Sequence, residues 1–180
     1  MERELVVAAR SGDEAAFARL LEREAARTFR AVLAVVRSPE DAEEVVQDAS
    51  VSAWRHISGL RDEDRWAAWY RRIAVHEALD RAGRRPRLRE ISIDAPAGLA
   101  DGVGATRDPT DGWDDRMVVL QALGGLSADD RAVLGLRFGA DLEVPDVAAA
   151  LGIPLGTAKS RLHRAIGRLA QVMGEHDGDR

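Results

Sequence analysis

Apolar residues recur at steps of three and four along most of this chain, as they do on the buried face of an amphipathic helix. The first such segment begins after Ser11-Gly12-Asp13 and places on one side Phe17, Leu20, Leu21, Phe29, Val32, Leu33 and Val36. Alternating stretches are few and aromatic residues make up only 4% of the chain, so little of it suits strands. The pattern predicts an all-α fold.

Two further helices are marked by their end signals. Ser38-Pro39-Glu40-Asp41 predicts a helix start, because Ser38 can cap the first turn, Pro39 costs nothing there and the acids face the positive end of the helix dipole. We expect this helix to end near Ser58-Gly59, and the next to run from about Arg65 to Gly83.

The stretch from Arg84 to about Gly112 breaks the helical pattern. It holds three prolines and four glycines without a sustained period, and so long a structureless connection is improbable inside one compact domain. From Pro86 to Asp115 there are three Arg and seven acidic residues, a net charge of -4. We interpret this stretch as a long flexible linker between two small helical domains.

After the linker, helices are predicted from Trp113 to Leu123 and from a cap at Ser127 to Phe138-Gly139. The segment from Val144 to Ala165 then predicts a helix-turn-helix. Its turn residues are suited to their places: Ala148 is small, Gly152 tolerates a positive φ and Ile153 can fill the angle between the helices.

The second helix of this motif is predicted to be apolar on one face and basic on the other. The apolar residues fall within one narrow arc: Ala158, Leu162, Ala165, Ile166 and Leu169. From Leu155 to Gly174 there are four cationic residues and no acid, a local charge of +4. Such a face suits reading of the DNA major groove, whereas the alternative is an ordinary solvated helix face.

Leu126–Leu134, Val147-Ala148 and Leu151–Ala165 resemble the fourth conserved region of the extracytoplasmic-function (ECF) sigma factors, whose helix-turn-helix reads the -35 promoter element. Asp41–Asp48 resembles the helix that binds core RNA polymerase, and Trp69–Asp80 resembles the helix that binds the -10 element. The two signatures stand in the family's order and cover nearly the whole chain.

The resemblance implies four parts: a sigma region 2 domain over 1–88, an acidic linker over 89–112, a sigma region 4 domain over 113–176 and a tail over 177–180. It implies a factor that binds core RNA polymerase, recognises both promoter elements, promotes DNA melting and initiates transcription of a specific regulon, without catalysis or a cofactor. The implied partners are core polymerase, through a coiled-coil of its largest subunit and its flap, promoter DNA and an anti-sigma factor. The linker would thread through the polymerase channel, although an inert tether is the alternative.

The resemblance also implies roles for individual residues. The -35 element would be contacted by Thr157, Lys159, Ser160, Arg161, His163, Arg164 and Arg168. The -10 element would be contacted by Arg61, Tyr70, Arg71, Arg72, His76, Arg81, Arg84 and Arg85. Core polymerase would be contacted by Asp41, Glu44, Val45, Gln47 and Asp48.

The local charge of two segments in the first domain agrees with part of this assignment. Five acids and no base lie between Glu40 and Asp48, and seven Arg against two acids give +5 from Arg71 to Arg89; the second set can neutralise phosphates. The resemblance also implies that the loop from about Ser58 to Asp64 shapes a pocket for a flipped -10 base. We expect Trp66 and Trp69 to be core residues, Tyr70 is open between core and base stacking, and His76 departs from the Asn common in the family.

Composition first argues against nucleic acid, because the chain has a formal net charge of -5 and a pI near 5.4. The local charges resolve this, since two basic surfaces are offset by an acidic helix and an acidic linker. The absence of cysteine excludes disulfides and a thiolate metal site and fits the cytoplasm. No apolar run approaches the length of a membrane span, and the first ten residues lack the apolar segment of a signal peptide.

Three other functions are possible. The first is a helix-turn-helix regulator of response-regulator type acting as a dimer, although the first domain lacks the alternating strand and helix pattern of a receiver. The second is an enzyme or ligand-binding protein, although no phosphate loop or metal spacing supports it and the four His are scattered. The third is a helical interaction protein that no longer binds promoters.

Overall fold

The computed structural model describes residues 2–83 and 119–177, and every element in these ranges is a helix, so the all-α prediction is confirmed. The elements are α1 (Glu2–Arg10), α2 (Glu14–Val36), α3 (Pro39–His56), η1 (Ile57–Gly59), η2 (Glu63–Arg65), α4 (Trp66–Arg81), η3 (Leu123–Gly125), α6 (Ala128–Leu134), η4 (Gly135–Gly139), α7 (Val144–Leu151) and α8 (Leu155–Asp177). Residues 119–122 are also helical. The predicted linker and most of the predicted helix from Trp113 lie outside the described residues.

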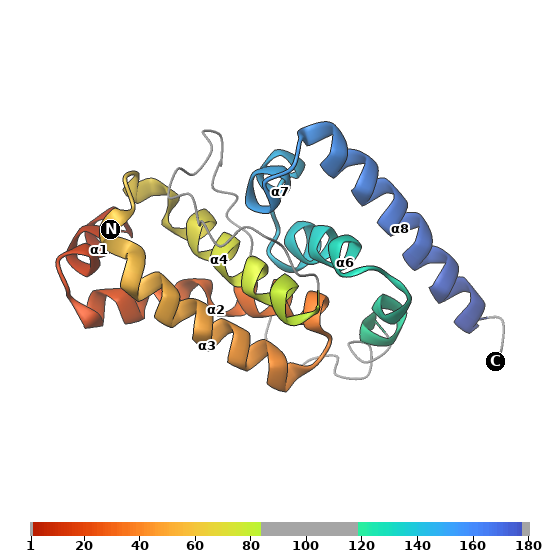
Figure 1. The fold of residues 1–180 in the computed structure, drawn as a ribbon, viewed down its shortest axis with the longest axis horizontal. Helices are drawn as coiled ribbons and strands as arrows, with labels where there is room; N and C mark the ends of the chain where they lie inside the picture. Colours follow the sequence, from red (N-terminus) through yellow and green to blue (C-terminus); the bar gives the residue numbers. More distant parts are fainter. Residues whose placement is uncertain (1, 84–118, 178–180) are drawn as a thin grey trace.

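Helices α1 to α4 form an N-terminal lobe (Figure 1). The cap at Ser38 acts as predicted, because Ser38 Oγ accepts a hydrogen bond from Asp41 N at 3.1 Å. Asp13 also caps α2 by accepting a hydrogen bond from Ala16 N at 2.9 Å. Helix α1 was not predicted from the sequence. It packs on α2 and buries Val6 and Ala9.

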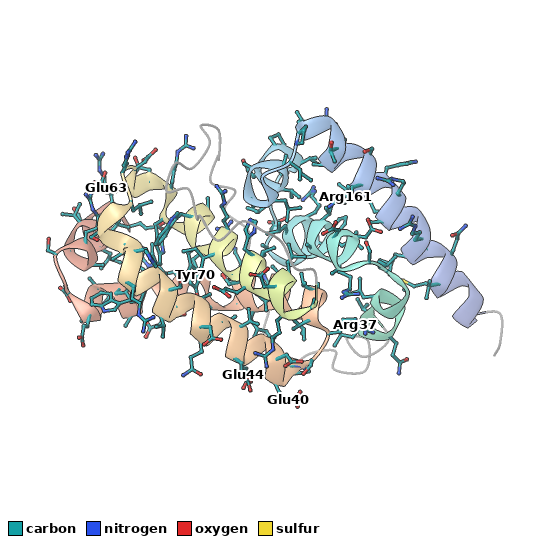
Figure 2. All side chains as sticks on the ribbon, in the orientation of Figure 1. Arg37, Glu40, Glu44, Glu63, Tyr70 and Arg161 are labelled. Carbon is teal, nitrogen blue, oxygen red and sulfur yellow. The ribbon has the colours of Figure 1, made fainter. Side chains whose placement is uncertain are left out.

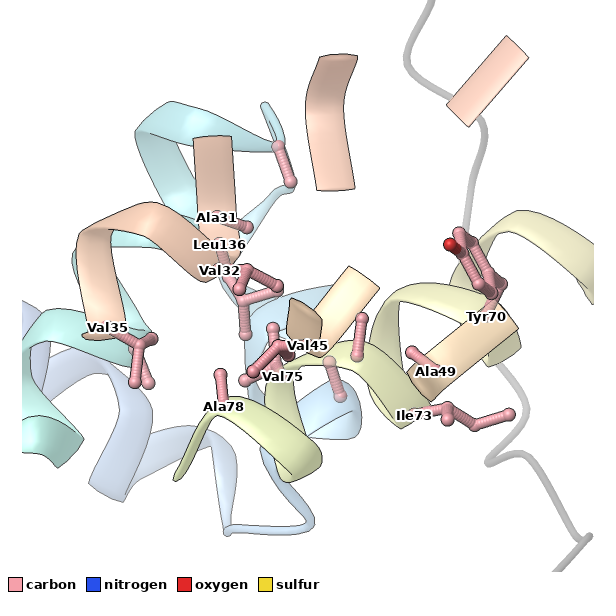
Figure 3. Close-up of a cluster of buried hydrophobic side chains, with 14 of the residues drawn as sticks. Ala31, Val32, Val35, Val45, Ala49, Tyr70, Ile73, Val75, Ala78 and Leu136 are labelled. Carbon is pink, nitrogen blue, oxygen red and sulfur yellow. The ribbon is translucent and has the colours of Figure 1, made fainter. Parts of the chain in front are cut away.

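The core of this lobe is built from α2, α3 and α4 around an aromatic cluster. Trp66 is fully buried, stacks on Tyr70 with a centroid distance of 5.4 Å, and meets Phe17 edge-on at 5.5 Å. Trp69 is also buried, as expected from the sequence. Figure 3 shows Val45 and Ala49 of α3 facing Ile73, Val75 and Ala78 of α4.

Helices α6, α7 and α8 with η4 form a C-terminal lobe in which the predicted helix-turn-helix is present (Figure 1). Ser127 caps α6 by accepting from Asp130 N at 3.1 Å, as predicted. The π-helical turn η4 then ends near the predicted Phe138-Gly139. Gly152 takes the left-handed conformation at φ 64°, which glycine adopts without steric cost because it has no Cβ.

The two lobes pack against each other along α2. Elements α6 and η4 lie on α2, and α7 lies on α4. Glycines in η4 allow the close approach: a Cβ on Gly135 would lie 2.7 Å from Ala31 O, and one on Gly139 would lie 3.0 Å from Ala31 N. Leu136 joins the N-terminal core (Figure 3), so the described parts of both lobes share one hydrophobic cluster.

Three side chains also reach a backbone carbonyl of the other lobe. Arg30 Nε donates to Gly139 O at 2.9 Å, Arg131 Nε donates to Val35 O at 2.8 Å, and His76 Nε2 lies 3.1 Å from Ala150 O. Val35 and Ala150 stand in the last turns of their helices, where carbonyls lack a partner within the helix. Burial and then neighbouring Arg37 lower the pKa of Arg131.

Candidate polymerase and nucleic-acid surfaces

Helix α8 presents the predicted reading face at the outer edge of the C-terminal lobe (Figure 1). A hydrogen bond of 3.0 Å from Ile153 N to Ala148 O closes the turn that leads into it. Ala158 and Ala165 are fully buried and fix the rotation of the helix. Four residues predicted to contact the -35 element are therefore exposed together: Lys159, Ser160, His163 and Arg164. Predicted Thr157 is half-buried beside them.

Two other predicted -35 residues hold α8 against α6. Arg161 Nη1 lies 3.1 Å from Asp129 Oδ2, and Arg168 Nη1 lies 2.6 Å from Asp130 Oδ2. Figure 2 shows Arg161 on α8. Half of the four cations counted on this helix are therefore engaged in ion pairs within the protein.

The apolar arc of α8 is only partly buried. Ile166, predicted to face inward, is 44% exposed, and that prediction is wrong. The reason is angle: at 100° per residue, Ile166 lies at the edge of the arc, about 100° around the helix from the fully buried Ala165.

Helix α3 carries an acidic outer face in the N-terminal lobe. Four residues of this face are exposed: Glu40, Glu44, Gln47 and Asp48. Figure 2 shows Glu40 and Glu44 at the outer edge of the N-terminal lobe. Predicted Val45 instead belongs to the core, with 2% of its surface exposed. This face is continuous over more than two turns, because residues 40, 44, 47 and 48 share one side of a helix.

Arg81 of α4 lies on this acidic face rather than beside the predicted -10 residues. Its Nη2 is 2.7 Å from Asp41 Oδ1 and also contacts Glu44 Oε2. The hydrogen bonds with Asp41 and then Glu44 raise the pKa of Arg81. The predicted polymerase-binding acids Asp41 and Glu44 are therefore already paired inside the chain, whereas Gln47 and Asp48 point outward beyond them.

Two residues predicted to contact the -10 element lie inside the lobe. Tyr70 is 1% exposed and shares a hydrogen bond of 2.9 Å with Ser50 Oγ. Burial raises the pKa of Tyr70, partly offset by the Ser50 bond and reinforced by the charge of Glu24. Arg71 is 7% exposed and donates to buried Glu24 at 2.7 Å. Neither side chain presents a surface to DNA in this arrangement.

The remaining predicted -10 residues divide into three groups. Arg61 is exposed in the loop before α4, and Arg72 is half-buried on α4. His76 is half-buried and held by the carbonyl of Ala150 in α7. Arg84 and Arg85 lie outside the described residues. The part of α4 that carries His76 is thus covered by the helix-turn-helix lobe.

Sequence reasoning missed the residues that hold these surfaces in place. Glu24, Glu63 and Arg131 are mostly buried charges that partner groups far away in the sequence. The pair of glycines at 135 and 139, one helical turn apart, is the one signal that could have indicated a close approach of another helix.

Within residues 2–83 and 119–177, no group of three or more His, Asp or Glu side chains could hold a metal ion. No helix in these ranges is both long and apolar enough to cross a membrane.

Comparison with known proteins identifies both lobes. Residues 18–87 match the family model "Sigma-70 region 2", and residues 122–171 match "Sigma-70, region 4". The chain is 33% identical to the ECF RNA polymerase sigma factor SigM of Mycobacterium tuberculosis over 171 residues, which cover 95% of this chain and 84% of SigM.

Two solved structures are similar as well. CnrH in complex with the cytosolic domain of CnrY has a TM-score of 0.71 and 25% identity, covering 97% of each chain. The sigma factor RpoE of Bartonella quintana, in complex with the anti-sigma factor NepR, has a TM-score of 0.64 and 28% identity, covering 88% of this chain and 96% of that one.

Proposed function

This chain belongs to the sigma-70 family as an ECF sigma factor, and on that premise we propose how its surfaces share the work of transcription initiation. A factor of this kind binds core RNA polymerase, recognises the -10 and -35 promoter elements and promotes melting of the DNA. We assign region 2 to residues 1–88, the linker to 89–112, region 4 to 113–176 and a tail to 177–180. The matched ranges 18–87 and 122–171 support these bounds.

The exposed basic face of α8 is the observation that carries the proposal. Lys159, Ser160, His163 and Arg164 reach into the major groove of the -35 element, where Arg and Lys can contact guanine edges and phosphates. Arg161 and Arg168 hold α8 at its angle to α6 through Asp129 and Asp130. Thr157, at the start of the helix, contacts the phosphate backbone.

In region 2, Arg61 and Arg72 contact the -10 element, with His76, Arg84 and Arg85 as further contacts. Tyr70 and Arg71 support that surface from inside the lobe, since both are buried. Arg81 instead binds to the acidic face of α3 through its ion pairs with Asp41 and Glu44.

Gln47 and Asp48 make the outermost contacts with core polymerase, on a coiled-coil of its largest subunit, and region 4 meets the flap. Complementary charge on the polymerase gives this contact its specificity. The chain catalyses no reaction of its own and acts in the cytoplasm, where RNA polymerase works. An anti-sigma factor is a further partner, as the complex of the similar RpoE with the anti-sigma factor NepR supports.

Two assays test the proposal. In vitro transcription with cognate core polymerase and a promoter library should yield products from promoters that share a -10 and a -35 sequence. A gel shift on those promoters should show tight, specific binding only when core polymerase is present. Strong specific binding by the free chain would favour a response-regulator type of factor, and absence of promoter-specific product would favour an interaction protein.

A further inference from the structure

The loop between α3 and α4 is held at two points that stand on either side of Arg61. Leu60 is 1% exposed and anchors the loop in the core, and its N donates to Ile57 O at 3.0 Å. Three residues later, Glu63 is 17% exposed and forms an ion pair with α1, a helix far away in the sequence. Figure 2 shows Glu63 at the end of the lobe where α1 and the loop meet.

The pair between Arg10 and Glu63 is the close one. Arg10 Nη1 lies 2.5 Å from Glu63 Oε1, with Arg10 33% exposed, and Arg3 approaches the other oxygen at 3.5 Å with 66% of its side chain exposed. A half-buried charge-assisted hydrogen bond of this kind is worth more than a surface ion pair, because water screens it less.

The loop has its own internal bonds next to this contact. Asp62 accepts from Asp64 N at 3.1 Å and from Arg65 Nε at 2.8 Å, which stiffens η2 up to the first turn of α4. Only Arg61 and Asp62 separate the buried Leu60 from the paired Glu63. The position of Glu63 therefore determines the direction in which the Arg61 side chain projects from the loop.

We propose that α1 is a part of the -10 recognition apparatus, in which Arg10 acts as a positioning residue that fixes Glu63 and thereby the loop carrying Arg61. The inference rests on the proposed contact of Arg61 with the -10 element. Helix α1 precedes residue 18, where the match to region 2 begins, so the positioning contact comes from outside the matched region. A loop held in place before binding loses less conformational entropy when it meets a DNA base.

Charge reversal tests the contact. Arg10→Glu and Glu63→Arg should each lower transcription from promoters with the preferred -10 sequence by about tenfold, within the range one coupled pair supplies. Combining the two substitutions restores opposite charges and should return transcription to within about threefold of the unmodified chain. The full chain is assayed with core polymerase on a library that varies the -10 and -35 elements separately.

The selectivity readout separates positioning from mere stability. The single variants should flatten the preference among bases at the -10 element and leave the -35 preference and polymerase binding unchanged. Arg23→Glu is the matched control, because Arg23 of α2 pairs with Glu2 of α1 at 4.0 Å rather than with Glu63; it should leave both preferences intact. Loss of -35 preference, or no rescue in the double variant, would overturn the proposal.

Arg61→Ala distinguishes failure of the premise from failure of the inference. If Arg61→Ala leaves -10 selectivity unchanged, the assigned role of the loop is refuted and the positioning role falls with it. If Arg61→Ala flattens -10 selectivity but Glu63→Arg does not, the loop reads DNA without help from α1 and only the inference is refuted.

Discussion

Tyr70 is the single tyrosine of the chain, and its environment decides what it does. It lies between Trp66 and Ser50 with 1% of its surface exposed. Stacking on a flipped base needs an open ring face, and here the ring stacks on Trp66, with an interplanar angle of 6°. The sequence allowed two roles for Tyr70, as a core residue or as a DNA contact, and its side chain lies in the core.

A spectroscopic titration should show this burial directly. Because burial raises the pKa of Tyr70 above its ordinary value of 10.0, the folded chain should show no tyrosinate absorbance at a pH where the denatured chain has titrated. The contribution of Tyr70 to the free energy of unfolding is fully present below about pH 10. It is lost as the pH rises through the pKa that Tyr70 has in the folded chain. Tyr70→Phe is the control that removes the signal. A folded chain that titrates like the denatured one would contradict burial.

Arg164 and Arg161 form a matched pair of arginines on one helix. Arg164→Ala removes an exposed contact and should weaken -35 binding by about 1 to 3 kcal/mol if it reads guanine. Arg161→Ala removes an ion pair with Asp129 and should cost less than about 1 kcal/mol of folding stability, with -35 selectivity retained. Promoter-library transcription and thermal unfolding measure the two effects. Equal loss of selectivity in both variants would contradict the division of roles.

At the scale of elements, the sequence predicted what depends on local signals. Caps at Ser38 and Ser127 and the turn at Gly152 are set by residues within one helical turn, and each was found where predicted. Helix α1 was missed, because its short apolar pattern lies among charges whose partner, Glu63, is distant in the sequence.

Helix α4 shows why part of the candidate site could not be predicted. Its buried residues surround almost the whole circumference, since α2, α3 and α7 all pack on it. A helix buried on all sides has no polar stripe to indicate its outer face. Three basic residues near the aromatic cluster look alike in the sequence but have different partners. Arg71 pairs with Glu24, Arg81 pairs with Asp41 and Glu44, and His76 contacts a carbonyl of α7.

The acidic face of α3 makes a prediction of its own. Asp48→Arg reverses a charge that is exposed beyond the paired Asp41 and Glu44, and should weaken the pull-down of core polymerase by at least about fivefold. Glu22→Arg on α2 makes the same charge change at another exposed position and should have no effect. Circular dichroism checks that both variants fold. Equal binding by the two variants would reject α3 as the docking surface.

At the scale of the whole molecule, the packing of the two lobes against each other, which we call the closed arrangement, conflicts with recognition of both promoter elements. The names of the -10 and -35 elements place them about 25 base pairs apart, or roughly 85 Å along B-DNA at about 3.4 Å per pair. In the closed chain, α7 contacts both α4 and α8. Helices α4 and α8, which we propose contact the -10 and -35 elements, cannot reach sites so far apart while both pack on α7, whereas the 35 residues between 83 and 119 can span about 115 Å.

The lobes must therefore separate when polymerase and promoter bind. A substitution at Gly135, where the lobes are in close contact, tests this separation. Gly135→Ala places a Cβ against Ala31 O, a backbone atom that cannot turn aside, so it should weaken the closed state by about 1 to 3 kcal/mol. Because the chain has no cysteine, Arg19→Cys and Gln171→Cys allow two dyes to be attached at exposed positions, one on each lobe.

Energy transfer between the dyes should be high in the free parent chain and lower in the free Gly135→Ala chain. When core polymerase is added, energy transfer in both chains should fall to the same value. Gly167→Ala controls for the gain in helix propensity, because a Cβ there meets nothing within 4 Å, and it should transfer energy like the parent chain. Since the lobes must separate when polymerase binds, the Gly135→Ala chain should also form holoenzyme faster. Unchanged transfer on binding polymerase would mean that the packed lobes persist in the working complex, and the covered face of α4 would then be excluded as a DNA contact.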